Sequence, residues 1–186
     1  MKHPSNQQFF AYWNEKRAGA RAPDRSEIEP EAVRELLPDI FVLSCDSAAG
    51  YPFRVAGTRL CALAGSDLKD KSFSELFVGD GRREIEDIIA IVTEELLAAV
   101  AGIMATSEDG TPAHLELLLL PFSHRAHAPL SLTGLLAPFE NGHGGLRDFK
   151  LTSWRYLDLP PAERLVPRTL RKLRIARGLM VYEGLR

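Results

Sequence analysis

The side chains that could do chemistry in this chain are few and far apart. The two cysteines, Cys45 and Cys61, match no metal-ligand spacing, and neither has a neighbouring Lys or His that would lower a thiol pKa. His124 and His127 have no cysteine or carboxylate close by, whereas a structural zinc site needs about four ligands. The sequence contains no hydrolase elbow, phosphate-binding loop or dinucleotide fingerprint. We therefore expect no metal site and no enzymatic activity.

Two charged residues interrupt apolar runs. Glu116 stands inside the run Leu115–Leu120, and strand alternation puts it on the same face as His114. We expect this face to point outward, toward solvent or a helix. Arg54 lies opposite Phe53 by the same alternation, so we expect it to point outward as well.

The order of the predicted helices and strands, which must position these residues, indicates an α+β domain. A long amphipathic helix over Arg82–Leu97 separates two groups of strands, with two strands before it and three after it. This order favours an antiparallel sheet with helices over a doubly wound parallel sheet. The predicted strands are Ile40–Leu43, Tyr51–Val55, a small-residue run from Leu97, His114–Phe122 and Leu130–Phe139, and the predicted short helices are Pro30–Leu37 and Arg59–Ala64.

A distinctive block lies between residues 36 and 68, where a hairpin runs directly into a short helix. Its marker residues are Leu36-Leu37-Pro38, Ile40-Phe41, Leu43, Phe53-Arg54, Gly57-Thr58, Leu60, Leu63, Gly65 and Asp67-Leu68. This block resembles the bacterial single-domain PAS family, and the match continues loosely to about Phe139. The resemblance implies a PAS-like five-stranded antiparallel sheet with short helices and one long connector helix, and it implies a sensory function.

The chain divides into three segments. We expect an N-terminal helix and linker over residues 1–29, the PAS-like sensory domain over 30–142, and a C-terminal extension over 143–186 that carries a basic amphipathic helix, Arg164–Arg177. The N-terminal helix, Ser5–Ala18, must pack its aromatic face on the sheet or on a second subunit. The possible interaction residues of the two end segments are Phe9, Phe10, Trp13, Arg168, Arg171 and Lys172. Nucleic acid is the disfavoured partner of the basic segment, because no helix-turn-helix accompanies it.

The resemblance also implies a cavity between the sheet and the short helices. Its lining would comprise Phe41, Leu43, Phe53, Val55, Leu60, Leu76, Ile88 and Leu117. The same residues could form a filled core, which we favour because ligand pockets normally show converging polar groups.

Cofactor binding in the related families depends on residues that differ here. Flavin-binding relatives carry an N-C-R-F-L-Q stretch, which Arg59-Leu60-Cys61-Ala62-Leu63 does not reproduce, and haem-binding PAS domains use a histidine in the connector helix, which Arg82–Leu97 lacks. We therefore expect neither flavin nor haem, and a small apolar ligand remains possible.

Composition sets the remaining limits. With 186 residues and 45% hydrophobic content, the chain can build a core without disulfide or metal crosslinks. The net charge of −2 gives no sign of a nucleic-acid or membrane partner. No segment reaches the ~20 apolar residues of a membrane span, and no signal peptide is apparent. We expect a cytoplasmic protein.

Two functional hypotheses follow. The first is a non-catalytic sensory and regulatory module that acts by protein–protein interaction, as a homodimer that passes its output to a separate signalling protein. The alternative is a small-molecule-binding sensor with an apolar ligand in the core.

Overall fold

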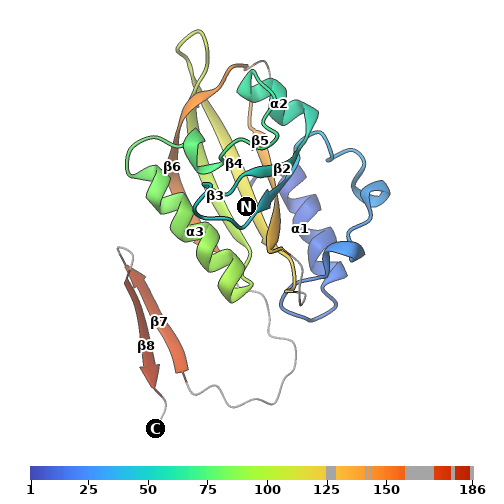
Figure 1. Cartoon of the computed structure of the whole chain (residues 1–186), viewed down its shortest axis with the longest axis vertical. Coiled ribbons are helices and arrows are strands. Elements are labelled where there is room, and N and C mark those ends of the chain that lie inside the picture. Colours follow the sequence, from blue (N-terminus) through green and yellow to red (C-terminus); the bar gives the residue numbers. More distant parts are fainter. Residues whose placement is uncertain (125–128, 141, 143, 158–169, 177–178, 185–186) are drawn as a thin grey trace.

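The computed structural model describes residues 1–124, 129–140, 142 and 144–157, together with the backbone of 170–176 and 179–184 (Figure 1). The α-helices are α1 (Pro4–Lys16), α2 (Thr58–Ala64) and α3 (Gly81–Glu95), and the 3-10 helices are η1 (Arg25–Glu27), η2 (Pro30–Val33) and η3 (Ser74–Leu76). The strands are β1 (Ile40–Ser44), β2 (Phe53–Ala56), β3 (Ala99–Thr106), β4 (Pro112–Pro121), β5 (Ser131–Pro138), β6 (Arg147–Tyr156), β7 (Leu170–Ala176) and β8 (Leu179–Gly184).

The main sheet has six strands in the order β2-β1-β5-β4-β3-β6, and every neighbouring pair is antiparallel. The predicted α+β class is confirmed, but the predicted number of strands is one too low. The missing strand is β6, which pairs with β3 along Arg147–Tyr156. The expected domain boundary at residue 142 precedes this strand, so the sheet continues into the segment assigned to the C-terminal extension.

The described part of the tail also differs from the prediction. Leu170–Ala176 forms strand β7, paired with β8, instead of the second half of an amphipathic helix. The β-branched Ile175 and Val181 favour the extended conformation, which outweighs the helical spacing of the leucines. Residues 158–169 lie outside the described part of the chain.

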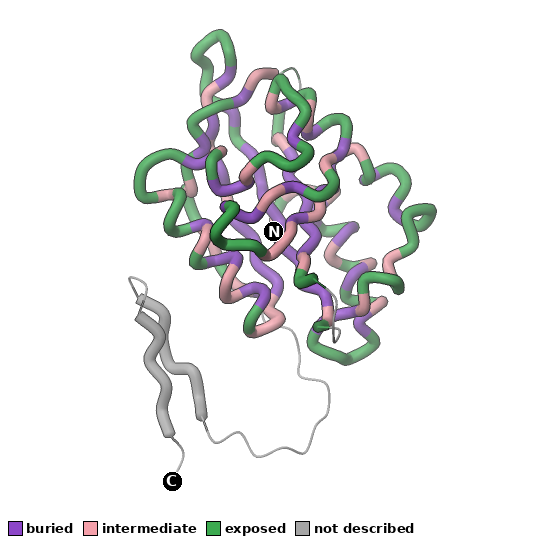
Figure 2. Tube along the Cα trace, in the orientation of Figure 1, coloured by how far each residue is buried: buried purple, intermediate pink, exposed green. Residues whose placement is uncertain are grey.

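The two faces of the sheet are covered by different elements (Figure 1). Helices α2 and α3 lie over the face that we call the inner face, where a cluster built on Phe41, Leu117 and Ile88 is buried. Helix α1 lies over the opposite, outer face against β4 and β5, and buries a second cluster that includes Phe9, Trp13 and further apolar residues. The buried residues concentrate in the central strands, and the exposed ones in the peripheral turns (Figure 2).

Local sequence explains how the marker block folds. Gly57 is the N-cap of α2, and the amides of Arg59 and Leu60 in the first turn donate to the Pro38 carbonyl oxygen at 2.9 and 3.1 Å. A Cβ atom at Gly57 would collide with that carbonyl, so a side chain is excluded here. Gly65 ends the helix in the left-handed conformation, as predicted.

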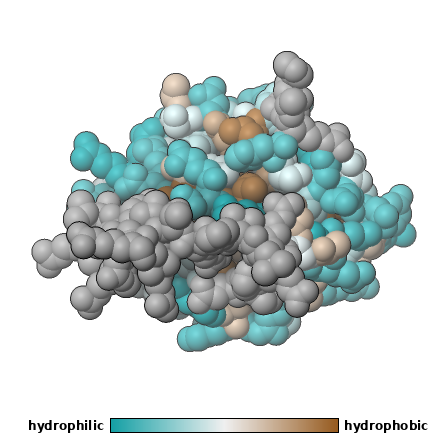
Figure 3. All heavy atoms as spheres, turned by 90° about the horizontal axis from the view of Figure 1, so that it is seen from below, coloured by the Kyte–Doolittle hydropathy of each residue, from teal (hydrophilic) through white to brown (hydrophobic). Residues whose placement is uncertain are grey.

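The face of the molecule seen from below shows how apolar residues are distributed on that side (Figure 3). In this view from below, most visible described residues are hydrophilic and the apolar ones form small separate spots. Scattered exposed apolar residues are normal for a folded domain.

Candidate functional site

Most of the predicted pocket residues are buried together on the inner face. Phe41, Leu43, Phe53, Leu60, Ile88 and Leu117 all belong to one apolar cluster. The ring of Phe41 lies 5.8 Å from that of Phe53 and 5.4 Å from that of Phe73, measured between centroids. These side chains therefore pack against one another beneath the helices.

The placement of Val55 on this wall is wrong. Its side chain is 50% exposed, and Arg54 beside it is exposed as well. The register shifts where Val42 opposes Val55 but Leu43 opposes Phe53, which leaves Arg54 as an extra residue in β2. Such a bulge interrupts the alternation of side chains between the two faces of the strand. Strict alternation predicts Val55 on the same face as Phe53, and that prediction fails here.

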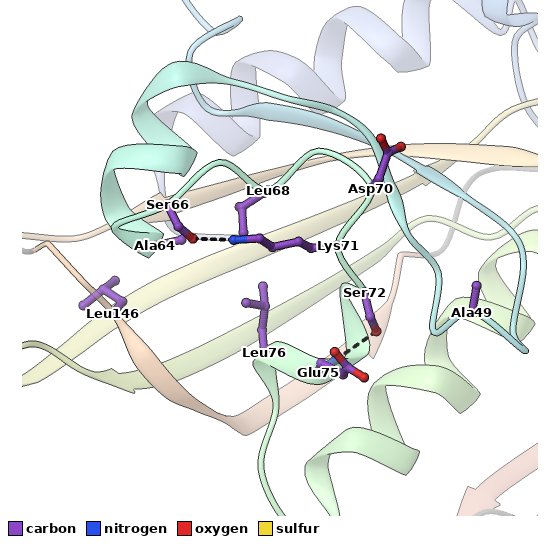
Figure 4. Close-up of a pocket in the computed structure, with 10 residues that line it drawn as sticks. All are labelled: Ala49, Ala64, Ser66, Leu68, Asp70, Lys71, Ser72, Glu75, Leu76 and Leu146. Atoms are coloured by element: carbon purple, nitrogen blue, oxygen red, sulfur yellow. Dashed lines mark hydrogen bonds between the residues drawn. The ribbon is translucent and has the colours of Figure 1, made fainter.

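A cavity of about 420 Å³ opens beside α2, between the loop that follows this helix, η3 and the start of β6 (Figure 4). Its lining residues are Ala49, Ala64, Ser66, Leu68, Asp70, Lys71, Ser72, Glu75, Leu76 and Leu146. Leu68 and Leu146 are buried and form apolar wall, while the Lys71 ammonium donates to the Ser66 hydroxyl at 3.0 Å. Of the predicted pocket residues, only Leu76 lines this cavity.

The cavity combines apolar surface with polar groups, which is the composition that small-molecule sites share. Lys71 carries a positive charge and Glu75 a negative one, and the Glu75 amide donates to the Ser72 hydroxyl at 3.3 Å. Sequence analysis did not identify this cavity, because its lining brings residues between 64 and 76 together with Ala49 and Leu146, which lie elsewhere in the sequence.

On the outer face, α1 is docked on the sheet of its own chain. Phe9 and Trp13 are fully buried there, and the Trp13 indole N–H donates to the Pro121 carbonyl oxygen at 3.0 Å. Phe10 is half-buried and stacks on Trp13 with 6.2 Å between ring centroids. The sequence predicts that this helix packs either on the sheet or on a second subunit. In the structure it packs on the sheet.

Glu116 anchors the beginning of α1 to the sheet. The residue is 6% exposed, and its carboxylate accepts hydrogen bonds from the backbone amides of Lys2, at 2.6 Å, and His3, at 3.0 Å. The Asn6 side-chain amide donates to the Glu116 carbonyl oxygen at 3.0 Å and to its carboxylate at 3.1 Å. The sequence predicts that Glu116 points outward, toward solvent or a helix, and in the structure it faces the start of helix α1. Sequence analysis did not identify its partner Asn6, although this polar residue precedes Phe9 and Trp13 by three and seven positions on the apolar face of the helix.

The N-cap of α1 is His3, whose Nδ1 accepts from the Ser5 amide at 3.2 Å. Asp39 lies close enough to the His3 ring for the two to interact electrostatically. Asp39 is 3% exposed, and its carboxylate pairs with the Arg59 guanidinium at 2.6 Å, while its Oδ1 makes no hydrogen bond within the described structure. Burial raises the pKa of this carboxyl, against the opposing effect of Arg59.

The remaining candidate residues are not brought together. Burial raises the pKa of the Cys45 thiol to about 11, so at neutral pH this thiol is protonated and a weak nucleophile. Cys61 lies on α2 and packs partly against the inner cluster. His124 has its Nε2 3.0 Å from the Thr93 carbonyl oxygen, and His127 lies outside the described residues.

In the ranges described above, no group of three or more His, Cys, Asp or Glu side chains is arranged to hold a metal ion. No helix in these same ranges is long and apolar enough to cross a bilayer.

The basic interaction residues of the tail fall partly outside the described chain. Arg168 is among the residues that are not described. Arg171 and Lys172 lie in β7, where their backbones pair with Glu183 and Tyr182 of β8.

An antiparallel sheet with short helices and a connector helix on one face and a docked helix on the other defines an α+β domain. The family model PAS_5, described as PAS domain, matches residues 1–137 of this chain. The chain belongs to the PAS domain family, which indicates a signalling sensor module.

Solved structures with a similar fold include LOV and PAS proteins. A Rhodobacter sphaeroides LOV protein is 16% identical over 58% of this chain, with a TM-score of 0.44, and the match covers 66% of that protein, just under two thirds. The PAS domain of an HTR-like protein from Haloarcula marismortui is 19% identical, with a TM-score of 0.44 and coverage of 59% of this chain and 88% of that one. A light-oxygen-voltage domain studied with a flavin analogue is 11% identical, with a TM-score of 0.46 and coverage of 60% and 84%. The comparison with curated proteins gave no match.

These comparisons correct the prediction that flavin is disfavoured. Several of the similar structures are LOV proteins, and one was studied with a flavin analogue. The prediction was based on a single absent motif around Cys61. The absence of this motif concerns one reactive residue and says nothing about the shape of a cofactor cavity. We therefore withdraw the prediction that flavin is disfavoured. The expectation about haem stays a prediction.

Proposed function

We propose that this PAS domain is a non-catalytic regulatory module that acts by protein–protein contact. In this proposal the regulated element is α1, which changes between a docked and a released position on the outer face. The observation that supports this proposal is the anchor at Glu116. A buried carboxylate that accepts two backbone amides and one side-chain amide fixes the start of α1 in one position. Hydrogen bonds to a charged acceptor contribute more than neutral ones, about 1.5–3 kcal/mol each.

The docked helix covers surface that cannot remain in water. Release of α1 would expose Phe9, Trp13 and the apolar outer side of β4 and β5, so the released state requires another surface in place of the helix. In the proposed mechanism a second copy of the chain supplies that surface, which gives a homodimer. A signal that favours one state over the other is then transmitted to a separate signalling protein as a change in which surface is exposed.

A conservative substitution tests the anchor. In Glu116→Gln, one carboxylate oxygen becomes an amide that faces the N–H groups of Lys2 and His3. We expect faster hydrogen exchange in α1, a larger share of dimer in light scattering after size exclusion, and unchanged exchange in β4. Glu31→Gln, at an exposed glutamate of η2, is the matched control and should change nothing.

Removal of residues 1–19 tests the dimer more directly. The deletion exposes the outer face permanently, so the truncated chain should elute as a dimer. A truncated chain that folds and remains strictly monomeric contradicts the role of α1 in covering a dimer surface.

The cavity beside α2 favours a second candidate function, a sensor of a small molecule. Its apolar walls and its charged groups, Lys71 and Glu75, suit a ligand with an apolar body and a polar end. An absorbance spectrum of the purified protein, followed by mass spectrometry of its denatured extract, tests this function. Recovery of a stoichiometric ligand whose binding is lost in Lys71→Ala supports it, and an extract without any ligand contradicts it.

A further inference from the structure

A second cavity, of about 290 Å³, lies on the outer face between the N-terminal segment and β6. Its residues come from five separate parts of the chain. They are Met1, Lys2, Val100, Ala101, Gly102, Ile103, His114, Leu115, Glu116, Phe139, Thr152, Ser153, Trp154 and Arg155. We call this cavity the β6 groove. It is separate from the cavity beside α2, with which it shares no residue.

The floor of the β6 groove is a glycine facing a bulge. Gly102 of β3 opposes Ser153, but the next residue of β3 opposes Leu151, so Thr152 is an extra residue in β6. A Cβ atom at Gly102 would lie 2.6 Å from the Thr152 hydroxyl and 3.0 Å from the Ser153 hydroxyl. The missing side chain thus makes room for two hydroxyl groups, which can donate hydrogen bonds above the floor.

The charges around the groove are unequal. Lys2 and Arg155 are exposed and positively charged, and His114 is exposed beside them. Glu116 is the one acidic residue among those that line the groove, and its carboxylate already accepts three hydrogen bonds from the N-terminal segment. The groove therefore offers positive charge and hydroxyl donors to an incoming group.

The groove also has an apolar side. Phe139 is 47% exposed at its rim, and Val100 lines it from β3. An apolar rim beside a few cations suits a peptide that carries both carboxylate and apolar side chains. A nucleic acid is less well matched, because its phosphate backbone is usually bound by many more cations than Lys2 and Arg155.

We propose that the β6 groove is a docking site for an acidic segment of a partner protein, whose carboxylates contact Lys2 and Arg155 and whose apolar side chains contact Phe139. This inference rests on the proposed function, since it names the chemistry of the partner that the regulatory module contacts. Lys2 lies directly before α1 and its amide is held by Glu116. A segment that binds the groove therefore stabilises the docked position of α1, because it has higher affinity for that state.

A peptide titration on the full chain, followed by NMR, tests the proposal. The probe is an acetylated and amidated peptide of sequence Glu-Leu-Glu-Glu-Leu-Glu, compared with the peptide in which every Glu is Gln. We expect the acidic peptide to shift the Gly102 amide resonance in a saturable way and the Gln peptide to bind about tenfold more weakly or worse. Equal binding of the two peptides, or shifts that avoid Gly102, overturns the proposal.

Two charge reversals on the same strand provide the matched comparison. Arg155→Glu should weaken the acidic peptide about tenfold, whereas Arg147→Glu, at an exposed arginine of β6 outside the groove, should leave the affinity within about twofold. Equal losses in both variants would mean general charge attraction and would overturn the site. A single-stranded oligonucleotide that shifts Gly102 at lower concentration than the peptide would also overturn it.

The same titration separates this proposal from the proposed function. If the acidic peptide fails to bind while Glu116→Gln still releases α1, the partner chemistry is wrong and the switch stands. If the peptide binds but the anchor variant leaves α1 exchange unchanged, the groove stands and the switch is wrong.

Discussion

The two faces of the sheet are covered in different ways. On the inner face, Phe41, Phe53 and Phe73 pack ring against ring under elements that belong to the middle of the chain. On the outer face, a terminal helix combines the apolar contacts of Phe9 and Trp13 with directional hydrogen bonds at Glu116 and Pro121. The cover of the inner face comes from the middle of the chain, whereas the outer cluster combines α1 with Val33 and Leu36 of the segment that follows it. We therefore expect the inner face to carry most of the stability of the fold, and we expect α1 to detach from the outer face without unfolding the rest of the domain.

The largest expected effect is on the inner face. Phe41→Ala removes a fully buried ring that contacts two others, and should lower the free energy of unfolding by about 3–5 kcal/mol. Urea denaturation followed by circular dichroism measures this loss, which should appear as one cooperative transition. If only α1 loses protection in this variant, the distinction between the faces is wrong.

Truncation on the outer face should act more locally. Trp13→Ala removes a fully buried ring and its hydrogen bond to Pro121, at a cost of about 3 kcal/mol in the docking of α1. Because the helix can detach by itself, we expect hydrogen exchange to accelerate about a hundredfold in α1, with little change in β1 and α3. Equal acceleration in all three elements would show that the helix and sheet unfold together.

The pH dependence of stability should report on Asp39. Its pKa in the folded chain is raised above the ordinary value of 3.8, mainly by burial, so the folded state binds more protons than the unfolded state between these two values. The stabilisation from protonated Asp39 is complete below the ordinary pKa and is lost as pH rises through the folded value.

The variant Asp39→Asn lacks this titration. The stability of the natural chain minus that of Asp39→Asn should therefore fall as pH rises above 3.8 and then become constant. Thermal or urea unfolding of both chains across this range measures the difference. A difference that grows with pH would show that the Arg59 ion pair outweighs burial.

The smallest effect is expected at the residue whose position the sequence rule misplaced. Val55→Thr changes a half-exposed side chain on β2 and should alter the free energy of unfolding by less than about 0.5 kcal/mol. Leu117→Ala, at a fully buried position of the same predicted wall, should cost about 2–5 kcal/mol and serves as the contrast. A large loss of unfolding free energy in Val55→Thr would show that the Val55 side chain is part of the core.

Sequence reasoning succeeded where local patterns decide the structure. The apolar spacing of Ile85, Ile88 and Val92 is that of one helix face, and these residues are buried in α3. Gly65 ends α2 because left-handed backbone favours glycine. The marker block from residue 36 to residue 68 was enough to identify the family.

The features that were missed depend on distant contacts or local irregularities. The strand Arg147–Tyr156 contains several charged residues, so its sequence resembles a polar segment. These residues are tolerated because only one side of the strand contacts β3 and the helices. The bulge in β2 changes which side Val55 faces, and no composition signal marks it. The Glu116 anchor joins residues more than a hundred positions apart. The presence of an unusual carboxylate was visible in the sequence, but its partner was not.

Strand β6 has a consequence for how the protein behaves at high concentration. Without it, β3 would be the edge of the sheet, and its sequence AVAGIMAT is eight residues long, carries no charge and would offer unpaired backbone groups to other chains. The strand that covers this edge has the sequence RDFKLTSWRY, with charged side chains and a bulge at Thr152. Charged and irregular edges resist pairing with another molecule's strand. The additional strand thus protects the protein against aggregation through its sheet.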